Sequence, residues 1–136
     1  MTHRLSLRVY YEDTDLAGIV YYANYLKFIE RGRSEWLREL GVDQVALKQR
    51  DGLVFAVRRI GADYLRPARF DDLIEVTTRL DEARAARLTL AQEVRRGDEL
   101  LFTATVTIAC LDAQGRPVRL PSALTSRLSG TETPHD

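Results

Sequence analysis

Residues 4–10 alternate between apolar and polar side chains, which is the pattern of a strand with one buried face. The apolar set consists of Leu5, Leu7 and Val9. Acidic and small residues then crowd residues 11–21, where Gly18 permits a backbone angle that other residues rarely adopt. We expect this segment to be a loop that leads into a helix.

Residues 22–40 carry apolar side chains every three or four positions, which predicts an amphipathic helix. Its apolar face consists of Leu26, Ile29, Trp36, Leu37 and Leu40. Arg33 falls on the same face as its one charged member, and Gly32 indicates a place where another backbone packs closely. A short second helix is expected from Asp43, as its N-cap, to Gln49.

Four later segments are rich in Val, Ile, Leu and Thr, as strands require. They are residues 53–65, 73–80, 86–96 and 100–111. Pro67 with the pair Asp71–Asp72 marks one turn, and Gly97–Asp98 marks a hairpin. Residues 129–136 read as a frayed tail.

The predicted order is therefore a strand, a long helix and four strands in a meander. One amphipathic helix facing one antiparallel sheet is a two-layer α+β architecture. We expect a single domain over residues 1–136, with a five-stranded antiparallel sheet wrapped around one long central helix.

Charge and cysteine content narrow the classes of function. Lys plus Arg and Asp plus Glu both number 20, so the basic excess typical of nucleic-acid binding is absent. Cys110 is the only cysteine, which excludes an intramolecular disulfide and favours a reducing, cytoplasmic location. His3 and His135 lie at the two ends and share no metal-ligand spacing with Cys110. No apolar run reaches the roughly 18 residues of a membrane span, and no signal core is evident.

The segment from Tyr11 to Tyr25 carries the chemistry. It places carboxylates, a glycine turn and a helix N-terminus within a short stretch. A helix N-terminus offers unpaired N–H groups to a developing oxyanion, and a nearby carboxylate can act as nucleophile or as general base. The alternative from the residues alone is an acidic loop in which Asp13, Thr14 or Asp15 only caps a turn.

The string DTDLAGIVYYANY at 13–25 resembles the 4-hydroxybenzoyl-CoA thioesterase family of hotdog proteins, especially its Tol-Pal-associated acyl-CoA thioesterase branch. The family pattern is D-x-D-x-x-G-[IV]-V-[YW]-x-x-N-Y before a helix. The resemblance continues through residues 23–37 and 63–76 and reaches about residue 128. It implies a hotdog fold and hydrolysis of acyl-CoA to free acid and CoA, with no cofactor, since CoA arrives as part of the substrate.

The resemblance also assigns roles to residues. Asp15 matches the catalytic carboxylate, as attacking nucleophile or as base on water, and the backbone N–H of Tyr22 matches the group that polarises the thioester carbonyl. Gly18 lets the loop turn back, and Asn24 orders it by hydrogen bonding. Many Tol-Pal members carry His where this chain has Tyr22, whereas the 4-hydroxybenzoyl-CoA enzymes carry Tyr, so the acyl preference stays open among short, long and aromatic groups.

The family places cations for the CoA phosphates near the turn where this chain has Arg84 and Arg87. The wider group of arginines in the strand region consists of Arg58, Arg59, Arg66, Arg69, Arg84 and Arg87. Glu30 could be a second acid, but an ion pair with Arg33, within the helix or between subunits, is the favoured interpretation. Trp36 and Cys110 are expected in the core.

The resemblance further implies a homodimer or homotetramer with active sites at the subunit interface. Acyl carrier protein is the alternative acyl carrier. Two other functions compete. A hydratase of the same fold needs a His–Asp pair, and this chain has no His between residues 3 and 135. An adaptor that binds acyl carrier protein or an envelope-associated complex needs no catalysis.

Overall fold

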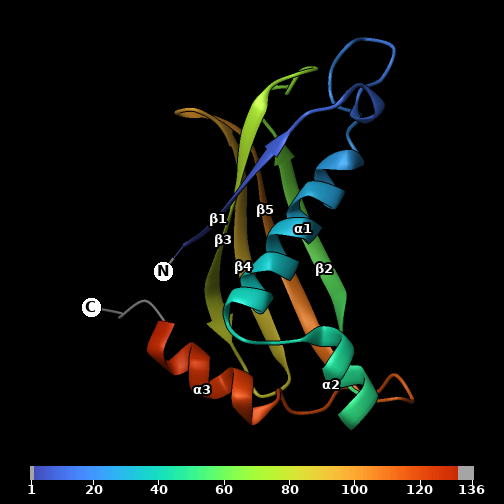
Figure 1. Cartoon of the computed structure of the whole chain (residues 1–136), viewed down its shortest axis with the longest axis vertical. Coiled ribbons are helices and arrows are strands. Elements are labelled where there is room, and N and C mark those ends of the chain that lie inside the picture. Colours follow the sequence, from blue (N-terminus) through green and yellow to red (C-terminus); the bar gives the residue numbers. More distant parts are fainter. Residues whose placement is uncertain (1, 132–136) are drawn as a thin grey trace.

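The computed structural model describes residues 2–131. A five-stranded antiparallel sheet curves around α1 (Asn24–Glu39), and α2 and α3 lie at one end of the molecule (Figure 1). The strands are β1 (His3–Arg8), β2 (Val54–Tyr64), β3 (Leu73–Ala83), β4 (Arg87–Arg96) and β5 (Glu99–Leu111). All five predicted strands are confirmed, within a few residues at each end.

The order of the strands in the sheet corrects the expected meander. The sheet runs β1-β3-β4-β5-β2, so β2 pairs with β5 and not with β3, its successor in sequence. The chain crosses the end of the sheet between Leu65 and Asp72, where the N–H groups of Leu65 and Arg66 both donate to the carbonyl of Leu101. This crossover leaves β2 as one edge of the sheet and β1 as the other.

The helical part is larger than one central helix. Besides α1, the chain forms a 3₁₀ turn at Tyr11–Asp13, α2 (Gln44–Asp51) and α3 (Ser122–Thr131). The predicted N-cap of α2 is confirmed, because the Asp43 carboxylate accepts the N–H of Ala46 at 3.0 Å. No helix was expected at α3. It ends at Thr131, and the rest of the predicted frayed tail lies outside the described residues.

The apolar face of α1 packs on the concave side of the sheet, slightly rotated from the predicted one. Leu26 is exposed, and Tyr25 and Phe28 are buried in its place. Gly32 meets the sheet closely, but through side chains and not through the backbone that the sequence predicted: a Cβ there would lie 2.7 Å from Cγ1 of Val76. Trp36 and Cys110 are both in the core.

Candidate active site

A short loop before α1 holds the predicted catalytic carboxylate. The loop closes on itself, because the N–H of Asp15 donates to the carbonyl of Ile19 at 2.9 Å and Gly18 donates back to Asp15 at 3.0 Å. Gly18 has a φ of +79°, which confirms the predicted left-handed turn. One carboxylate oxygen of Asp15 accepts the N–H of Ala17 at 2.9 Å, and its side chain is otherwise open to solvent.

Two backbone donors are unpaired within residues 2–131 where this loop becomes α1. The N–H groups of Tyr22 and Ala23 have no acceptor within residues 2–131, whereas those of Asn24 and Tyr25 already bond within the first turn. The carbonyl of Tyr22 is held by the hydroxyl of Tyr64 at 3.0 Å. The first turn of α1 contains no acidic residue, so the partial positive charge of the helix start is not neutralised there.

Asp13 and Asn24 fix the shape of the loop. The side-chain amide of Asn24 donates to the carbonyl of Asp13 at 2.9 Å, and the N–H of Tyr21 donates to the same carbonyl at 2.9 Å. The Asp13 carboxylate accepts the N–H of Tyr10 at 2.8 Å. The predicted ordering of the loop by Asn24 is therefore present, and the Asp13 side chain bonds to backbone.

The loop is anchored on the segment between β2 and β3. Ile19 pairs with Arg69, and the N–H of Val20 donates to the carbonyl of Ala68 at 2.8 Å. The N–H of Ala68 in turn donates to the hydroxyl of Tyr25 at 2.9 Å, in the core. Burial raises the pKa of Tyr25, which favours the neutral phenol in the core.

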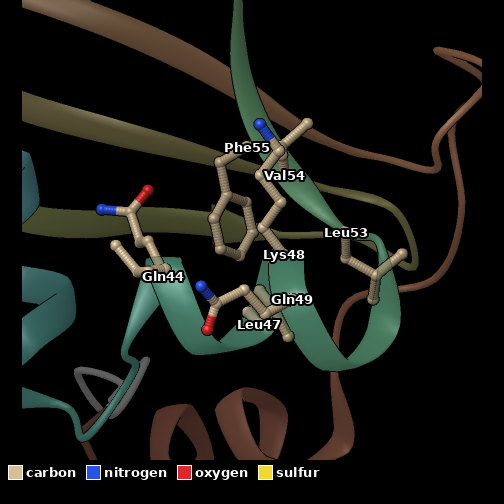
Figure 2. Close-up of a pocket in the computed structure, with 8 residues that line it drawn as sticks. Gln44, Leu47, Lys48, Gln49, Leu53, Val54 and Phe55 are labelled. Carbon is tan, nitrogen blue, oxygen red and sulfur yellow. The ribbon is translucent and has the colours of Figure 1, made fainter.

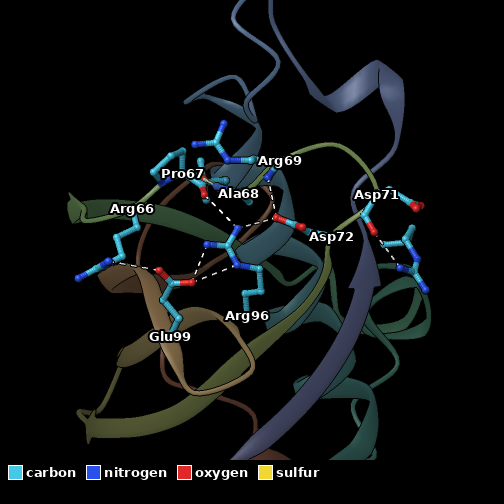
Figure 3. Close-up of polar contacts among 10 residues, drawn as sticks. Arg66, Pro67, Ala68, Arg69, Asp71, Asp72, Arg96 and Glu99 are labelled. Carbon is cyan, nitrogen blue, oxygen red and sulfur yellow. Dashed lines mark hydrogen bonds and ion pairs between the residues drawn. The ribbon is translucent and has the colours of Figure 1, made fainter.

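An ion-pair network that the sequence did not reveal holds the same segment (Figure 3). Arg96 bonds to the carboxylates of Asp72 and Glu99, each at 2.6 Å, and to the carbonyl of Pro67 at 3.3 Å. Asp72 also accepts the N–H of Arg69 at 2.8 Å. The hydrogen bond from Arg96 lowers the pKa of Glu99, and Glu99 and Asp72 raise the pKa of Arg96. In the sequence, Pro67 and Asp72 only marked a turn, and Arg96 and Glu99 only flanked the predicted Gly97–Asp98 hairpin.

Aromatic side chains gather beside Asp15. The rings of Tyr21 and Tyr22 lie 4.9 Å apart, and Tyr22 meets Tyr64 edge to face at 6.2 Å. The pKa of Tyr21 is raised mainly by the phenol of Tyr22 and, to the least degree, by the charge of Asp15. All three tyrosines are exposed, so within one chain this apolar surface is uncovered.

The predicted phosphate-binding arginines lie elsewhere. Arg84 and Arg87 flank the turn between β3 and β4, where Arg84 pairs with Glu82 at 2.9 Å. This turn contacts the segment before α3 through a bond from Leu120 to Ala85, at the opposite end of the sheet from the loop before α1 (Figure 1). A single chain thus brings Asp15, Gly18, Tyr22 and Asn24 together and leaves Arg84 and Arg87 apart.

A pocket of about 700 Å³ also lies at that far end, between α2 and the start of β2 (Figure 2). Its lining includes the apolar side chains of Leu47, Leu53 and Phe55 and the charged side chain of Lys48. The pocket lies between two elements, and no local sequence pattern indicates that they are close to each other. It could therefore not be predicted from the sequence. It contains none of the predicted site residues.

The expected ion pair between Glu30 and Arg33 within the helix is not formed. Glu30 accepts the hydroxyl of Ser34 at 2.7 Å, and Arg33 donates to the amide oxygen of Gln92 at 3.0 Å. Within residues 2–131, no three His, Cys, Asp or Glu side chains gather in a way that could hold a metal ion. In the same part of the chain, no helix combines the length and apolarity needed to cross a membrane.

The fold and the loop together define a hotdog-type protein with an exposed carboxylate in the loop that leads to unpaired backbone donors. Residues 9–128 match the model of the thioesterase-like superfamily, and the chain belongs to that family. The resemblance drawn from the 13–25 motif is thereby confirmed.

Three relatives illustrate the match. The chain is 42% identical to the acyl-CoA thioesterase YbgC of Haemophilus influenzae, with 85% of each chain covered. It is 38% identical to the acyl-CoA thioester hydrolase YbgC of Escherichia coli O6:H1, with 89% of this chain and 91% of the relative covered. The crystal structure of a probable thioesterase from Bartonella henselae superimposes with a TM-score of 0.86 at 40% identity, covering 89% of this chain and all of the other.

Proposed function

We propose that the protein is an acyl-CoA thioesterase in which Asp15 is the catalytic carboxylate. The observation that carries the proposal is the placement of the exposed Asp15 carboxylate in the loop that ends at the unpaired N–H groups of Tyr22 and Ala23. Relatives at 38–42% identity over most of the chain bear the names acyl-CoA thioesterase and acyl-CoA thioester hydrolase. We place the enzyme in the cytoplasm, where its substrate and a reduced Cys110 are both expected.

The chemistry needs no metal or prosthetic group. The thioester carbonyl oxygen accepts the N–H of Tyr22, which stabilises the negative charge that develops on it. Asp15 either attacks the carbonyl carbon or removes a proton from the attacking water. The C–S bond then breaks, the sulfur leaves as CoA, and water supplies the oxygen and proton that complete the free acid and the thiol.

A second copy of the chain completes this site in our proposal. The edge strand β2 is exposed from Val57 to Tyr64, and an unpaired edge invites pairing with another strand. Antiparallel pairing of two β2 strands about a two-fold axis brings the far end of one sheet beside the catalytic loop of the other. Arg84 and Arg87 of the partner subunit would then serve the CoA phosphates of this chain's site, in a dimer or in a tetramer of two dimers.

Hydrolysis of an acyl-CoA panel tests the function. We expect release of free thiol from at least one of a short aliphatic, a long aliphatic and a benzoyl thioester of CoA, with kcat/KM identifying the preferred acyl group. The same acyl group on acyl carrier protein compares the two carriers. Binding of acyl carrier protein without turnover of any thioester would favour the adaptor role over the enzyme.

A further inference from the structure

The peptide group that joins Tyr22 to Ala23 is bonded at one end only. Its carbonyl oxygen, which belongs to Tyr22, accepts the hydroxyl of Tyr64 at 3.0 Å. Its N–H, which belongs to Ala23, has no acceptor within residues 2–131. The same carbonyl accepts the N–H of Tyr25 only at a longer 3.4 Å, and the N–H of Leu26 donates to Ala23 instead at 3.2 Å. Tyr64 thus makes the shorter of the two bonds that hold this peptide group.

The local backbone directs the N–H of Ala23 along the helix. The N–H of Asn24 donates to the carbonyl of Tyr21 at 2.8 Å, which closes a turn around Tyr22 and Ala23. Ala23 itself is helical, with φ −70° and ψ −21°. Peptide groups in a helical turn lie roughly parallel to the helix axis, with their N–H groups toward the N-terminal end. The unpaired N–H of Ala23 is therefore aligned with α1 at the end where the N–H of Tyr22 is also unpaired.

The Tyr64 ring that supplies this hydroxyl is held by two buried rings. Tyr64 is the last residue of β2 and is paired with Phe102 of β5. Its ring lies 4.9 Å from that of Phe102 and meets the ring of Tyr25 edge to face at 5.4 Å. Burial raises the pKa of Tyr64, which favours the neutral phenol that donates the bond. The sheet thereby fixes one end of a peptide group that lies at the start of α1.

We propose that Tyr64 is a positioning residue that orients the N–H of Ala23 as a second donor to the thioester carbonyl oxygen, beside the N–H of Tyr22. The inference rests on the proposed thioesterase function. An oxyanion hole acts through donors that are fixed before the reaction, so a peptide group that is free to tilt stabilises the developing charge less. A carbonyl that accepts a hydrogen bond also polarises its own peptide group, which strengthens the N–H as a donor. Tyr64 acts through this peptide group and need not touch the substrate.

Steady-state kinetics of the full-length protein on its best acyl-CoA substrate test the proposal. Tyr64→Phe keeps the ring and removes the hydroxyl. Because loss of a whole oxyanion donor costs about 10²–10³ in kcat, loss of its support should lower kcat by about fivefold to fiftyfold. KM should stay within about twofold, since the effect arises only where charge develops in the transition state. Tyr10→Phe is the matched control and should leave kcat unchanged, because Tyr10 is exposed and its hydroxyl forms no hydrogen bond within residues 2–131.

A backbone ester locates the effect. Lactic acid introduced in place of Ala23 by nonsense suppression keeps the methyl side chain and replaces the N–H by an oxygen, which cannot donate. This ester should lower kcat by at least about tenfold, and Tyr64→Phe should then lower it no further, because Tyr64 acts through this peptide group.

Additive losses of kcat in the double variant overturn the proposal, and so does a Tyr64→Phe protein whose only change is a lower Tm. Wild-type protein that hydrolyses no acyl-CoA overturns the proposed function as well. The same outcomes for Tyr64 in an active enzyme overturn this inference alone.

Discussion

Two aspartates separated by a single residue act differently in the loop before α1. The Asp13 carboxylate accepts a hydrogen bond from the backbone N–H of Tyr10. The backbone carbonyl of Asp13 accepts hydrogen bonds from the Asn24 side chain and from the N–H of Tyr21. The Asp15 carboxylate receives only the N–H of Ala17 and faces solvent. Residue type does not distinguish the two carboxylates, whereas their hydrogen bonds do, and this difference is the reason that our proposal assigns the reaction to Asp15.

Gly32 allows close packing of α1 on the sheet because it has no side chain. Replacing it with Ala should favour the isolated helix by about 1 kcal/mol. The added Cβ would lie 2.7 Å from Val76, a β-branched residue with little freedom to move. Overpacking costs about 1–3 kcal/mol, and a contact as short as 2.7 Å favours the upper part of that range, so we expect Gly32→Ala to lower the free energy of unfolding by about 1–2 kcal/mol net.

Urea unfolding at one fixed protein concentration measures this change. Gly61→Ala is the control, because a Cβ at Gly61 meets no atom within 4 Å. It should be at least as stable as the wild type, by up to about 1 kcal/mol, because Gly inside a strand is less favourable than Ala. A Gly32→Ala protein as stable as the wild type would show that the sheet yields to the extra methyl group.

The sequence could predict the residues of the loop because they act over a short range. Asp15, Gly18, Tyr22 and Asn24 lie within ten consecutive positions, and apart from the bond from Tyr64 to the Tyr22 carbonyl their bonds run within the loop or to the start of the helix. Arg33 and Gln92 are 59 residues apart, and only the register of β4 against α1 brings them together. A local pattern therefore marked Arg33 as odd without indicating its partner.

At the level of elements, the crossover between β2 and β3 supports the loop before α1. Arg96 joins the end of β4 to Asp72 before β3 and to Glu99 at the start of β5. The crossover then pairs with Ile19 and Val20 of the loop. The loop that holds Asp15 is thus connected, through the crossover, to an ion-pair network outside the loop.

This network predicts a pH dependence of stability. The pKa of Glu99 is lowered from its ordinary value of 4.5, mainly by its hydrogen bond with Arg96. A carboxyl group with a lowered folded-state pKa contributes stability above its unfolded pKa and loses that contribution as pH falls through the folded pKa. Below about pH 4.5 the wild type should therefore lose its advantage over Glu99→Gln.

Thermal unfolding of both proteins from about pH 7 down to about pH 3 checks this. Glu12→Gln serves as the control, because Glu12 forms no ion pair within residues 2–131. A difference in Tm between wild type and Glu99→Gln that does not change over this range would contradict the assignment.

Strands and the long helix were predictable because alternation and helical spacing are local. The strand that pairs with β2 was not predictable, because all the strands share a similar alternation. Only the crossover after β2 determines that β2 pairs with β5. The helix α3 was missed because its apolar signal is weak. Its buried residues Leu124 and Leu128 can be recognised as core residues only once the positions of Leu120 and of the end of the sheet are known.

At the level of the whole molecule, Asp15 and the arginine pair lie at opposite ends of the sheet. If a dimer joins them, each active site contains Asp15 of one chain and Arg84 and Arg87 of the other. Arg84→Ala with Arg87→Ala should then raise KM for acyl-CoA and leave kcat nearly unchanged, because contacts remote from the carbonyl bind substrate and transition state alike. Sedimentation should show a dimer or tetramer, not a 15.5 kDa monomer.

Mixed dimers test the arrangement directly. Chains carrying Asp15→Asn are combined with chains carrying both arginine substitutions, so that one of the two sites in a mixed dimer regains all its groups. At low acyl-CoA concentration the mixture should be more active than the mean of its two parents. Activity equal to that mean would contradict a site shared between subunits.

The central claim is that the Asp15 carboxylate performs the hydrolysis, and kcat of Asp15→Asn on the best acyl-CoA substrate tests it most directly. Asp13→Asn is the matched control, and Tyr22→Phe keeps the backbone donor while removing the phenol. We predict that Asp15→Asn lowers kcat by at least about 10²-fold with little change in KM or Tm. Asp13→Asn should cost much less in kcat, and Tyr22→Phe should stay within about tenfold of the wild type. An Asp15→Asn enzyme with nearly wild-type kcat would contradict the account.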